Sequence, residues 1–414
     1  MIRDILLIQK RELEKRLSER YIERDEELKY IDKDIIKVVI GPRRSGKSFF
    51  LIHKLRISGK FGYVNFDDER LLETRDYDEI INAANALYEN PDYLLLDEIQ
   101  NLDKWELFVN RMQRQGYKLF ITGSNSKLLS KELATHLTGR HLELIIFPFS
   151  FKEFIQSQEK ELTESEKKEK LLEYLSHGGY PEPFVKNLGY AEYLSTLFDS
   201  IIYKDIIRRY KIRSVQGITD LATYLVSNIA TEFSYNTLAQ VTKCKSIHTV
   251  EKYLKYLEEA FIFFKIKRFS FRVKEQVASN KKIYCTDNGF VHAKAFTFKP
   301  DFGKLFENTV ATELKKLELK KLIDIFYWKS PQSEVDFVVK KGNKITQLIQ
   351  VCYDLQDIKT KEREVRALIN GSKELRCNDL LVISSDYEAV EEVSWFGIKR
   401  TIRFIPLWKW LMTL

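Results

Sequence analysis

The chain of 414 residues is poor in cysteine, glycine and proline, with 4, 16 and 8 of each. The cysteines, at positions 244, 285, 352 and 377, form no C-x-x-C pair, which argues against a structural zinc site and fits a reducing cytosol better than a secreted disulfide framework. No apolar run approaches the roughly 20 residues of a membrane helix. The N-terminal stretch to Arg16 has too short an apolar core for a signal peptide. We therefore expect a cytoplasmic protein with no membrane partner.

The overall composition is typical of a globular protein. Hydrophobic residues make up 44% of the chain and charged residues 31%, which excludes a disordered or collagen-like chain. The length predicts two or three domains. The net charge of +8 comes from 68 basic and 60 acidic residues, so it favours anionic partners only weakly and permits nucleic-acid binding without demonstrating it.

The first part of the chain alternates short apolar, β-branched runs with helical patterns. An amphipathic helix is predicted before Tyr21, and five strands are predicted at residues 35–40, 62–66, 93–96, 118–122 and 142–147. Buried strands that alternate with helices predict an α/β fold with a mostly parallel, doubly wound sheet.

The first predicted strand runs directly into a glycine-rich motif, G-x-x-x-x-G-K-S, at residues 41–48. A helix is predicted after it, which is the context that a phosphate-binding loop requires. Gly41 and Gly46 allow the backbone to wrap around phosphate with its amides pointing inward. We expect Lys47 to lie along the β- and γ-phosphates and the Ser48 hydroxyl to bind Mg²⁺. The candidate nucleotide-binding residues are Gly41, Pro42, Arg43, Arg44, Ser45, Gly46, Lys47, Ser48 and Phe49.

Two further strands end in polar residues. Asp97 and Glu98 follow a leucine run, and we expect Asp97 to hold Mg²⁺ and Glu98 to polarise an attacking water. The next strand ends near Ser124 and Asn125, which are candidates for contact with the γ-phosphate, with Thr122 as a further option. Helix capping and ordinary loop chemistry are the alternatives for these residues.

This order of motifs resembles the AAA+ branch of P-loop ATPases. The glycine-rich loop, the acid pair, residues 122–125 and the Leu-Thr-Gly-Arg at 137–140 resemble, more specifically, a family of archaeal and bacterial predicted ATPases. The segments 147–154 and 178–181 match the pattern of that family too. The resemblance implies ATP and Mg²⁺ as cofactors and, by analogy, a ring or dimer of subunits. It also implies an ATPase domain at 1–155, a helical lid or connector at 156–212, a winged helix at 213–290 and a nuclease-like domain at 291–414.

Arg140 acquires a possible catalytic role only through this resemblance. It is then expected to approach the γ-phosphate, either in its own subunit or from a neighbouring one, and to stabilise charge in the transition state. A solvated or carboxylate-paired arginine is the alternative.

The middle of the chain predicts three helices, at 218–229, 237–241 and 246–259, followed by strands at 261–268 and 281–285. This is the order of a winged helix. Basic residues on the third helix and its approach could neutralise the phosphates of nucleic acid, with DNA favoured, whereas a protein-docking module with a solvated basic face is the alternative. These candidate residues are Lys243, Lys245, His248, Lys252 and Lys255.

From Phe302 onward the chain resembles a PD-(D/E)xK nuclease core. Glu307, Asp336, Gln350 and Cys352 stand at the motif positions, where the family uses acids to hold a metal and a lysine to position water. Gln350 replaces an acid and Cys352 replaces the lysine. A neutral amide binds metal poorly and a protonated thiol carries no positive charge, so we expect a degenerate motif in a domain that serves as a binding platform.

Together these patterns predict an Mg²⁺-dependent ATPase that couples ATP turnover to the binding or remodelling of nucleic acid. A slow nucleotide-controlled protein-docking or signalling switch and, less well supported, a metal-dependent nuclease are the alternative functions.

Overall fold

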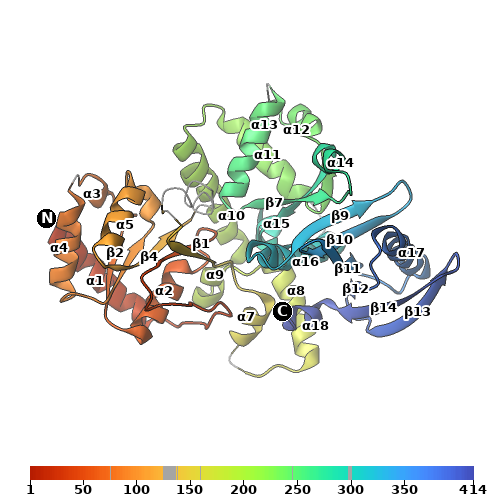
Figure 1. The fold of residues 1–414 in the computed structure, drawn as a ribbon, viewed down its shortest axis with the longest axis horizontal. Helices are drawn as coiled ribbons and strands as arrows, with labels where there is room; N and C mark the ends of the chain where they lie inside the picture. The colour runs from red at the N-terminus through yellow and green to blue at the C-terminus, as the bar shows by residue number, and fades with distance from the viewer. Residues whose placement is uncertain (75, 125–136, 138, 159, 245, 297–300) are drawn as a thin grey trace. The chain divides into compact units, whose positions relative to one another are not determined.

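The computed structural model divides the chain into two compact units (Figure 1). The first comprises residues 1–149, 184–186 and 259–261, and the second comprises 150–183, 187–258 and 262–414. Within the described part of the chain, no helix combines the length and the apolar character needed to cross a membrane. The residues that the structure describes are 1–74, 76–124, 137, 139–158, 160–244, 246–296 and 301–414.

The first unit is built on a five-stranded sheet in the order β2-β3-β4-β1-β5. Every neighbouring pair is parallel, and β1 and β3 are buried along their whole length, as expected for apolar strands covered on both faces. The five predicted strands are therefore confirmed. Their bounds are Ile36–Ile40 (β1), Phe61–Asn65 (β2), Tyr93–Asp97 (β3), Lys118–Gly123 (β4) and His141–Ile145 (β5).

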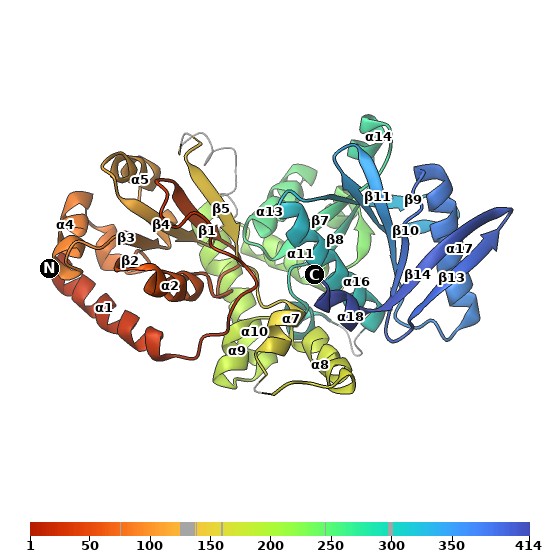
Figure 2. The same cartoon turned by 60° about the horizontal axis from the view of Figure 1, so that its bottom comes forward.

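Helices cover both faces of this sheet, with α2 on one side and α5 on the other (Figures 1 and 2). The core beneath α2 contains Phe50, Leu51 and Leu55 against Val39 and Phe120 of the sheet. The predicted N-terminal helix is confirmed as α1, which packs against α4 and β2. The elements are α1 (Ile2–Ser18), α2 (Lys47–Ser58), α3 (Glu69–Leu72), α4 (Tyr77–Leu87), the 3₁₀ helix η1 (Ile99–Asn101) and α5 (Trp105–Arg114).

A run of helices follows. The polar segment after residue 158 lies in the predicted helical lid or connector. It contributes the first turns of α8, where Thr163 and Glu166 form a capping box. The bounds are α7 (Phe151–Gln156), α8 (Glu164–His177), α9 (Pro181–Lys186), α10 (Tyr190–Ser200), the π-helix η3 (Ile201–Arg208), α11 (Val215–Ser227), α12 (Tyr235–Val241), α13 (Ile247–Glu259), α14 (Val273–Ala278), α15 (Asn288–Lys294), α16 (Phe302–Leu319), α17 (Ile358–Leu375) and α18 (Leu407–Met412).

The second unit contains a nine-stranded mixed sheet in the order β13-β14-β12-β11-β10-β9-β7-β8-β6. Its core packs α17 against β10 and β11, with Val335, Leu348, Leu368 and Phe404 buried together. The strands are β6 (Thr231–Phe233), β7 (Phe263–Arg268), β8 (Lys281–Cys285), β9 (Asp324–Lys329), β10 (Glu334–Lys341), β11 (Lys344–Val351), β12 (Leu380–Ser384), β13 (Ala389–Trp395) and β14 (Ile398–Pro406).

This sheet crosses the predicted boundary at residue 290. The two strands predicted as a wing are present as β7 and β8, but β7 also pairs in parallel with β9, where Lys267 lies opposite Phe326. On the other side β8 pairs with β6, a short strand that the sequence patterns did not predict. The helices α11 to α13 agree with the predicted ones, and their assignment to a winged helix stays a prediction. The strands that follow them form the interior of a larger sheet.

Candidate functional site

The glycine-rich motif forms the turn between β1 and α2, as predicted. Gly41 has φ +146°, and a Cβ added to it would lie 2.1 Å from the carbonyl oxygen of Ile146. Gly46 has φ +92° in the left-handed region. Only glycine fits both requirements. Between them, the buried Ser45 hydroxyl donates to the Ile146 carbonyl at 2.8 Å, which ties the loop to the chain that leaves β5.

Lys47 is the first residue of α2, and its side chain is buried in the loop. Its Nζ donates to the carbonyl oxygens of Gly41 and Pro42, at 3.1 and 2.8 Å. The ammonium therefore lies beside the loop that leads into the N-terminus of a 12-residue helix, where the first backbone amides are found. Both carry positive charge, so the structure forms an anion-binding site of the kind found at helix N-termini.

Ser48, from the start of α2, and Asp97, from the end of β3, are brought into contact. The Ser48 hydroxyl donates to Asp97 Oδ1 at 2.7 Å, and the Tyr63 hydroxyl donates to Asp97 Oδ2 at 2.9 Å. Burial, and then the neighbouring charge of Glu98, raises the pKa of Asp97 above its ordinary value. A buried carboxylate of this kind gains from a nearby cation. A hydroxyl and a carboxylate oxygen are also ligands that Mg²⁺ uses, so these two residues fit such an ion.

Glu98 has the opposite electrostatic environment. Burial alone would raise its pKa, but the charge of Lys47 and the hydrogen bond from Gln100, with smaller contributions from Arg43 and Ser124, outweigh burial and lower the pKa. Glu98 is thus held ionised, as a base must be, next to an acid whose pKa is raised. Two adjacent carboxyl groups with opposite shifts suit two different roles.

Thr122, at the end of β4, connects these two acids. Its hydroxyl donates to Asp97 Oδ1 and accepts from the backbone amide of Glu98 at 2.9 Å. The sheet order explains this, because β4 lies between β1, which carries the loop, and β3, which carries the acids. Of the residues predicted here, Ser124 is buried near Glu98, and Asn125 lies outside the described residues. The sequence patterns named Thr122 only as a further option for contact with the γ-phosphate.

The remaining predicted loop residues have varied surroundings. Arg43 forms an ion pair with Asp67, with 3.6 Å between Nη2 and Oδ2. Arg44 is exposed, at φ +63°. Phe49 packs edge-on against the His53 ring, with 4.6 Å between centroids, and His53 stacks on Tyr21.

Arg140 does not reach the loop within its own chain. It directly precedes β5, and its carbonyl accepts from the amide of Ile36 at the start of β1. The loop instead follows Ile40, at the other end of the same strand. The intervening four residue steps span about 13 Å. The side chain is exposed, so approach from the same subunit is contradicted by the strand direction, whereas approach from a neighbouring subunit stays a prediction.

The sequence patterns missed Arg24. Its guanidinium donates to the carbonyls of Ser45, at 3.0 Å, and of Phe147, and it lies over the ring of Phe149 at 4.9 Å. Arg24 therefore links the phosphate loop to the segment that follows β5 and stabilises the loop. It belongs to an irregular segment with no motif, and its partners are 21 and 123 residues away, so the sequence carried no signal for it.

The predicted basic surface is present on α13 and its approach. His248, Lys252 and Lys255 are exposed at positions i, i+4 and i+7 of the helix, which places them on one face. Lys243 is exposed just before the helix, and Lys245 lies outside the described residues. The opposite face of α13 is buried through Val250, Leu254 and Leu257.

The residues predicted for the degenerate nuclease motif are only partly brought together. Glu307 of α16 and Asp336 of β10 both contact the ammonium of Lys282, at 2.9 and 3.3 Å. Gln350 accepts from the Asp336 amide at 3.3 Å. Cys352 donates instead to the Asp354 carbonyl at 3.2 Å, and burial raises the pKa of its thiol to about 12.

These residues do not fit the divalent metal that a nuclease core requires. A lysine already lies among the acids, and Gln350 donates its amide to Glu364 at 2.6 Å. Within the described ranges, no three His, Cys, Asp or Glu side chains are arranged to hold a metal ion. No step of a metal-dependent cleavage follows from this arrangement.

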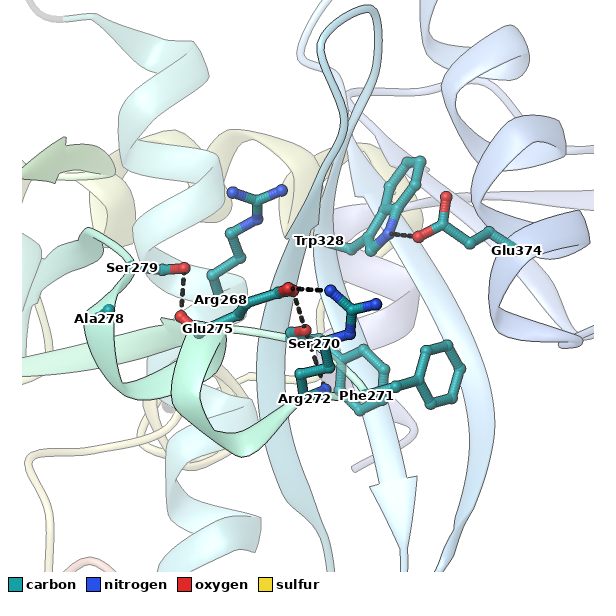
Figure 3. A pocket seen from close by; sticks show the side chains of 10 residues that line it. Arg268, Ser270, Phe271, Arg272, Glu275, Ala278, Ser279, Trp328 and Glu374 are labelled. Carbon is teal, nitrogen blue, oxygen red and sulfur yellow. Dashed lines mark hydrogen bonds and ion pairs between the residues drawn. The ribbon is translucent and has the colours of Figure 1, made fainter.

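A cavity of about 480 Å³ lies in the second unit, beside α14 (Figure 3). Most of its polar groups are paired within its own wall, while Arg268 donates to the carbonyl of Lys329. Arg272 and Ser270 contact Glu275, at 2.9 Å each, and the indole of Trp328 donates to Glu374 at 3.0 Å. The cavity therefore presents no group arranged for chemistry, and the first unit holds the stronger candidate site.

Comparisons with known proteins agree with this assignment. Residues 33–155 match an AAA domain, while residues 168–301 and 302–407 each match a domain of unknown function (DUF8612 and DUF4143). The chain is 35% identical to the uncharacterized protein MJ1544 of Methanocaldococcus jannaschii over 95% of its length and 92% of that protein. It is 31% identical to an uncharacterized protein of Haemophilus influenzae over 80% of its length and 85% of that protein.

Among solved structures, the Walker-type ATPase PABY2304 of Pyrococcus abyssi aligns with 62% of this chain and 90% of its own, at 16% identity and a TM-score of 0.42.

Proposed function

Because the chain belongs to the same family as protein MJ1544 of Methanocaldococcus jannaschii and carries an AAA domain, we propose that it binds ATP with Mg²⁺ and hydrolyses it. The observation that carries the proposal is the meeting of Ser48 with Asp97, at 2.7 Å, at the mouth of the glycine-rich loop. Residues 49 positions apart are placed in contact there by the parallel sheet, with the ionised Glu98 alongside.

Each residue of the site has a distinct task in this proposal. The amides at the start of α2 and the Lys47 ammonium bind the phosphate tail. Ser48 and Asp97 would hold Mg²⁺, which when bound neutralises phosphate charge. Glu98 accepts a proton from the attacking water, or orients it, because its pKa is kept low. Thr122 fixes both acids through its single hydroxyl.

Two variants test this assignment. Lys47→Ala should abolish ATP binding measured by calorimetry, because the loop loses the only side-chain charge it buries. Glu98→Gln should keep ATP binding and reduce turnover by at least a hundredfold, the lower range for losing a general base. Lys60→Ala, which removes a half-exposed lysine paired with Glu89, is the matched control. Unchanged ATP affinity in Lys47→Ala would reject the proposal, and wild-type turnover in Glu98→Gln would require another base.

We further propose that nucleic acid, with DNA favoured, is the partner whose binding is coupled to ATP turnover. The supporting observation is the exposed row of His248, Lys252 and Lys255 on one face of α13. Contacts of lysine with phosphate must weaken steeply as salt rises, because they release counterions.

This coupling is tested by measuring ATP turnover with and without single- and double-stranded DNA and RNA at two salt concentrations. Stimulation that is lost at high salt, and that falls in a Lys243→Glu, Lys252→Glu double variant, supports the proposal. A Lys373→Glu, Lys399→Glu double variant, at exposed positions of α17 and β14, is the control with the same change in net charge. Turnover that is indifferent to every nucleic acid would instead favour a nucleotide-controlled protein-docking switch.

A further inference from the structure

The second unit buries a lysine among three acids, in the place where the nuclease resemblance predicts a metal. Lys282 lies on β8 and is only 4% exposed. Its Nζ is 2.9 Å from Glu307 Oε1, 2.6 Å from Glu334 Oε1 and 3.3 Å from Asp336 Oδ1. These four residues form the Lys282 cluster. They come from three elements, β8, α16 and β10.

The charge of Lys282 is kept by its partners. Burial alone would lower its pKa, but Tyr284, then Glu307, Asp336 and Glu334, more than offset burial and raise the pKa well above the ordinary value. A lysine that stays protonated in a buried position acts as a fixed counter-charge for the acids around it.

Asp336, by contrast, is kept in its neutral form. Burial, and then the charge of Glu307, raises its pKa to about 8 in spite of Lys282. A carboxyl group that is protonated at neutral pH is a poor ligand for a divalent ion. Its second oxygen is also engaged, because the backbone amide of Val351 donates to Asp336 Oδ2 at 3.0 Å.

The other two acids have further donors as well. Tyr284 donates its hydroxyl to Glu307 Oε1 at 2.7 Å. Lys329 Nζ lies 3.3 Å from Glu334 Oε2. A divalent ion would need about six oxygen ligands, and to obtain these carboxylates it would have to displace one ammonium and compete with a second.

We propose that the Lys282 ammonium takes the place of the divalent ion in this acid cluster, so that the C-terminal part of the chain works as a metal-free scaffold. The lysine comes from a strand in the segment predicted as a wing, whereas the acids come from the segment predicted as nuclease-like. The cluster thus fastens the two segments into one body. This proposal is independent of ATP hydrolysis.

Manganese binding tests it directly. The full chain, without nucleotide, is titrated with Mn²⁺ and the free ion is followed by electron paramagnetic resonance, for the wild type and for Asp336→Asn. We expect the two titrations to coincide, because any binding near Ser48 and Asp97 is common to both. Mn²⁺ binding that Asp336→Asn removes would overturn the proposal. So would Mn²⁺-dependent cleavage of plasmid DNA or of RNA that depends on Asp336.

A second measurement tests the counter-charge itself. Lys282→Met should lower the thermal unfolding midpoint by roughly 5 °C or more, because it leaves the largely buried Glu307 carboxylate without its cation. Lys340→Met is the matched control, since it removes a lysine of β10 whose partner Asp324 is half exposed. A midpoint for Lys282→Met equal to that of the control would overturn the proposal. If Lys282→Met does not fold, the loss supports the counter-charge, and the Mn²⁺ titration of the wild type still decides the question of the metal.

Discussion

At the scale of single residues, the candidate ATP site depends on the hydroxyl of Thr122, which the sequence patterns offered only as a further option. Asp97 and Glu98 are adjacent in the chain, yet the pKa of the first is raised and that of the second is lowered. Thr122 contacts both residues, because its hydroxyl donates to the Asp97 carboxylate and accepts from the backbone amide of Glu98. Loss of this hydroxyl would remove one of three hydrogen bonds to the Asp97 carboxylate and would leave the backbone amide of Glu98 without its partner. An unsatisfied buried group typically costs about 1–3 kcal/mol.

We therefore expect Thr122→Val, which keeps the shape and removes the hydroxyl, to reduce ATP turnover about tenfold or more while ATP affinity changes little. Ser124→Ala is the informative comparison, because the sequence patterns favoured Ser124 for contact with the γ-phosphate. The measurement is steady-state turnover together with calorimetric ATP binding. A strong defect in Ser124→Ala with none in Thr122→Val would assign the role to Ser124.

At the scale of elements, the break between α8 and α9 is held by a carboxyl group from far along the chain. Asp287, the N-cap of α15, accepts the amide hydrogens of Gly179 and Gly289 at 2.7 and 2.8 Å. A Cβ added to Gly178 would lie 1.7 Å from Asp287 Oδ1, so glycine is needed where this carboxyl packs. Burial raises the pKa of Asp287 to about 6, although the two amides act to lower it.

This shift predicts a pH dependence of stability with a definite sign. A carboxyl whose pKa is raised in the folded state binds its proton more tightly there, so its contribution to stability is fully present below the unfolded pKa of about 4 and is lost as the pH rises through 6. Between pH 7 and pH 5 the wild type should gain about 1 kcal/mol from Asp287 that Asp287→Asn does not gain.

The difference in unfolding free energy between wild type and Asp287→Asn, measured by denaturant titration at the two pH values, checks this. Asp301→Asn, at the exposed N-cap of α16, is the control. A difference that is constant with pH, or that shrinks on acidification, would contradict the raised pKa.

The elements themselves were largely predictable from the sequence, and their lateral order was not. Runs such as Ile36–Ile40 are apolar and β-branched, and they alternate with helical patterns, so local signals were enough to place all five strands of the first sheet. The position of β4 between β1 and β3 depends on long-range packing. This position is what brings Thr122 into contact with Asp97 and Glu98. Lys282 was assigned to a wing strand for the same reason, because nothing local indicates that β7 pairs with β9.

At the scale of the whole molecule, strand direction limits what Arg140 can do. The phosphate loop lies at the carboxyl end of β1, and Arg140 lies beside the amino end of the same strand. The arginine could therefore stabilise charge on a phosphate only at the site of another copy of the chain. Such a finger is worth about a thousandfold or more in turnover in other P-loop enzymes.

If Arg140 acts in this way, Arg140→Ala should bind ATP normally and turn it over slowly, and the specific activity of the wild type should rise with protein concentration. Mixing Arg140→Ala with Glu98→Gln should then recover part of the activity, because an assembly of the two contains sites with an intact Glu98 from one copy and an intact Arg140 from the other. Recovery requires two chains, so a monomer cannot mimic it. Wild-type turnover in Arg140→Ala would instead leave Arg140 as a solvated side chain at the edge of the sheet.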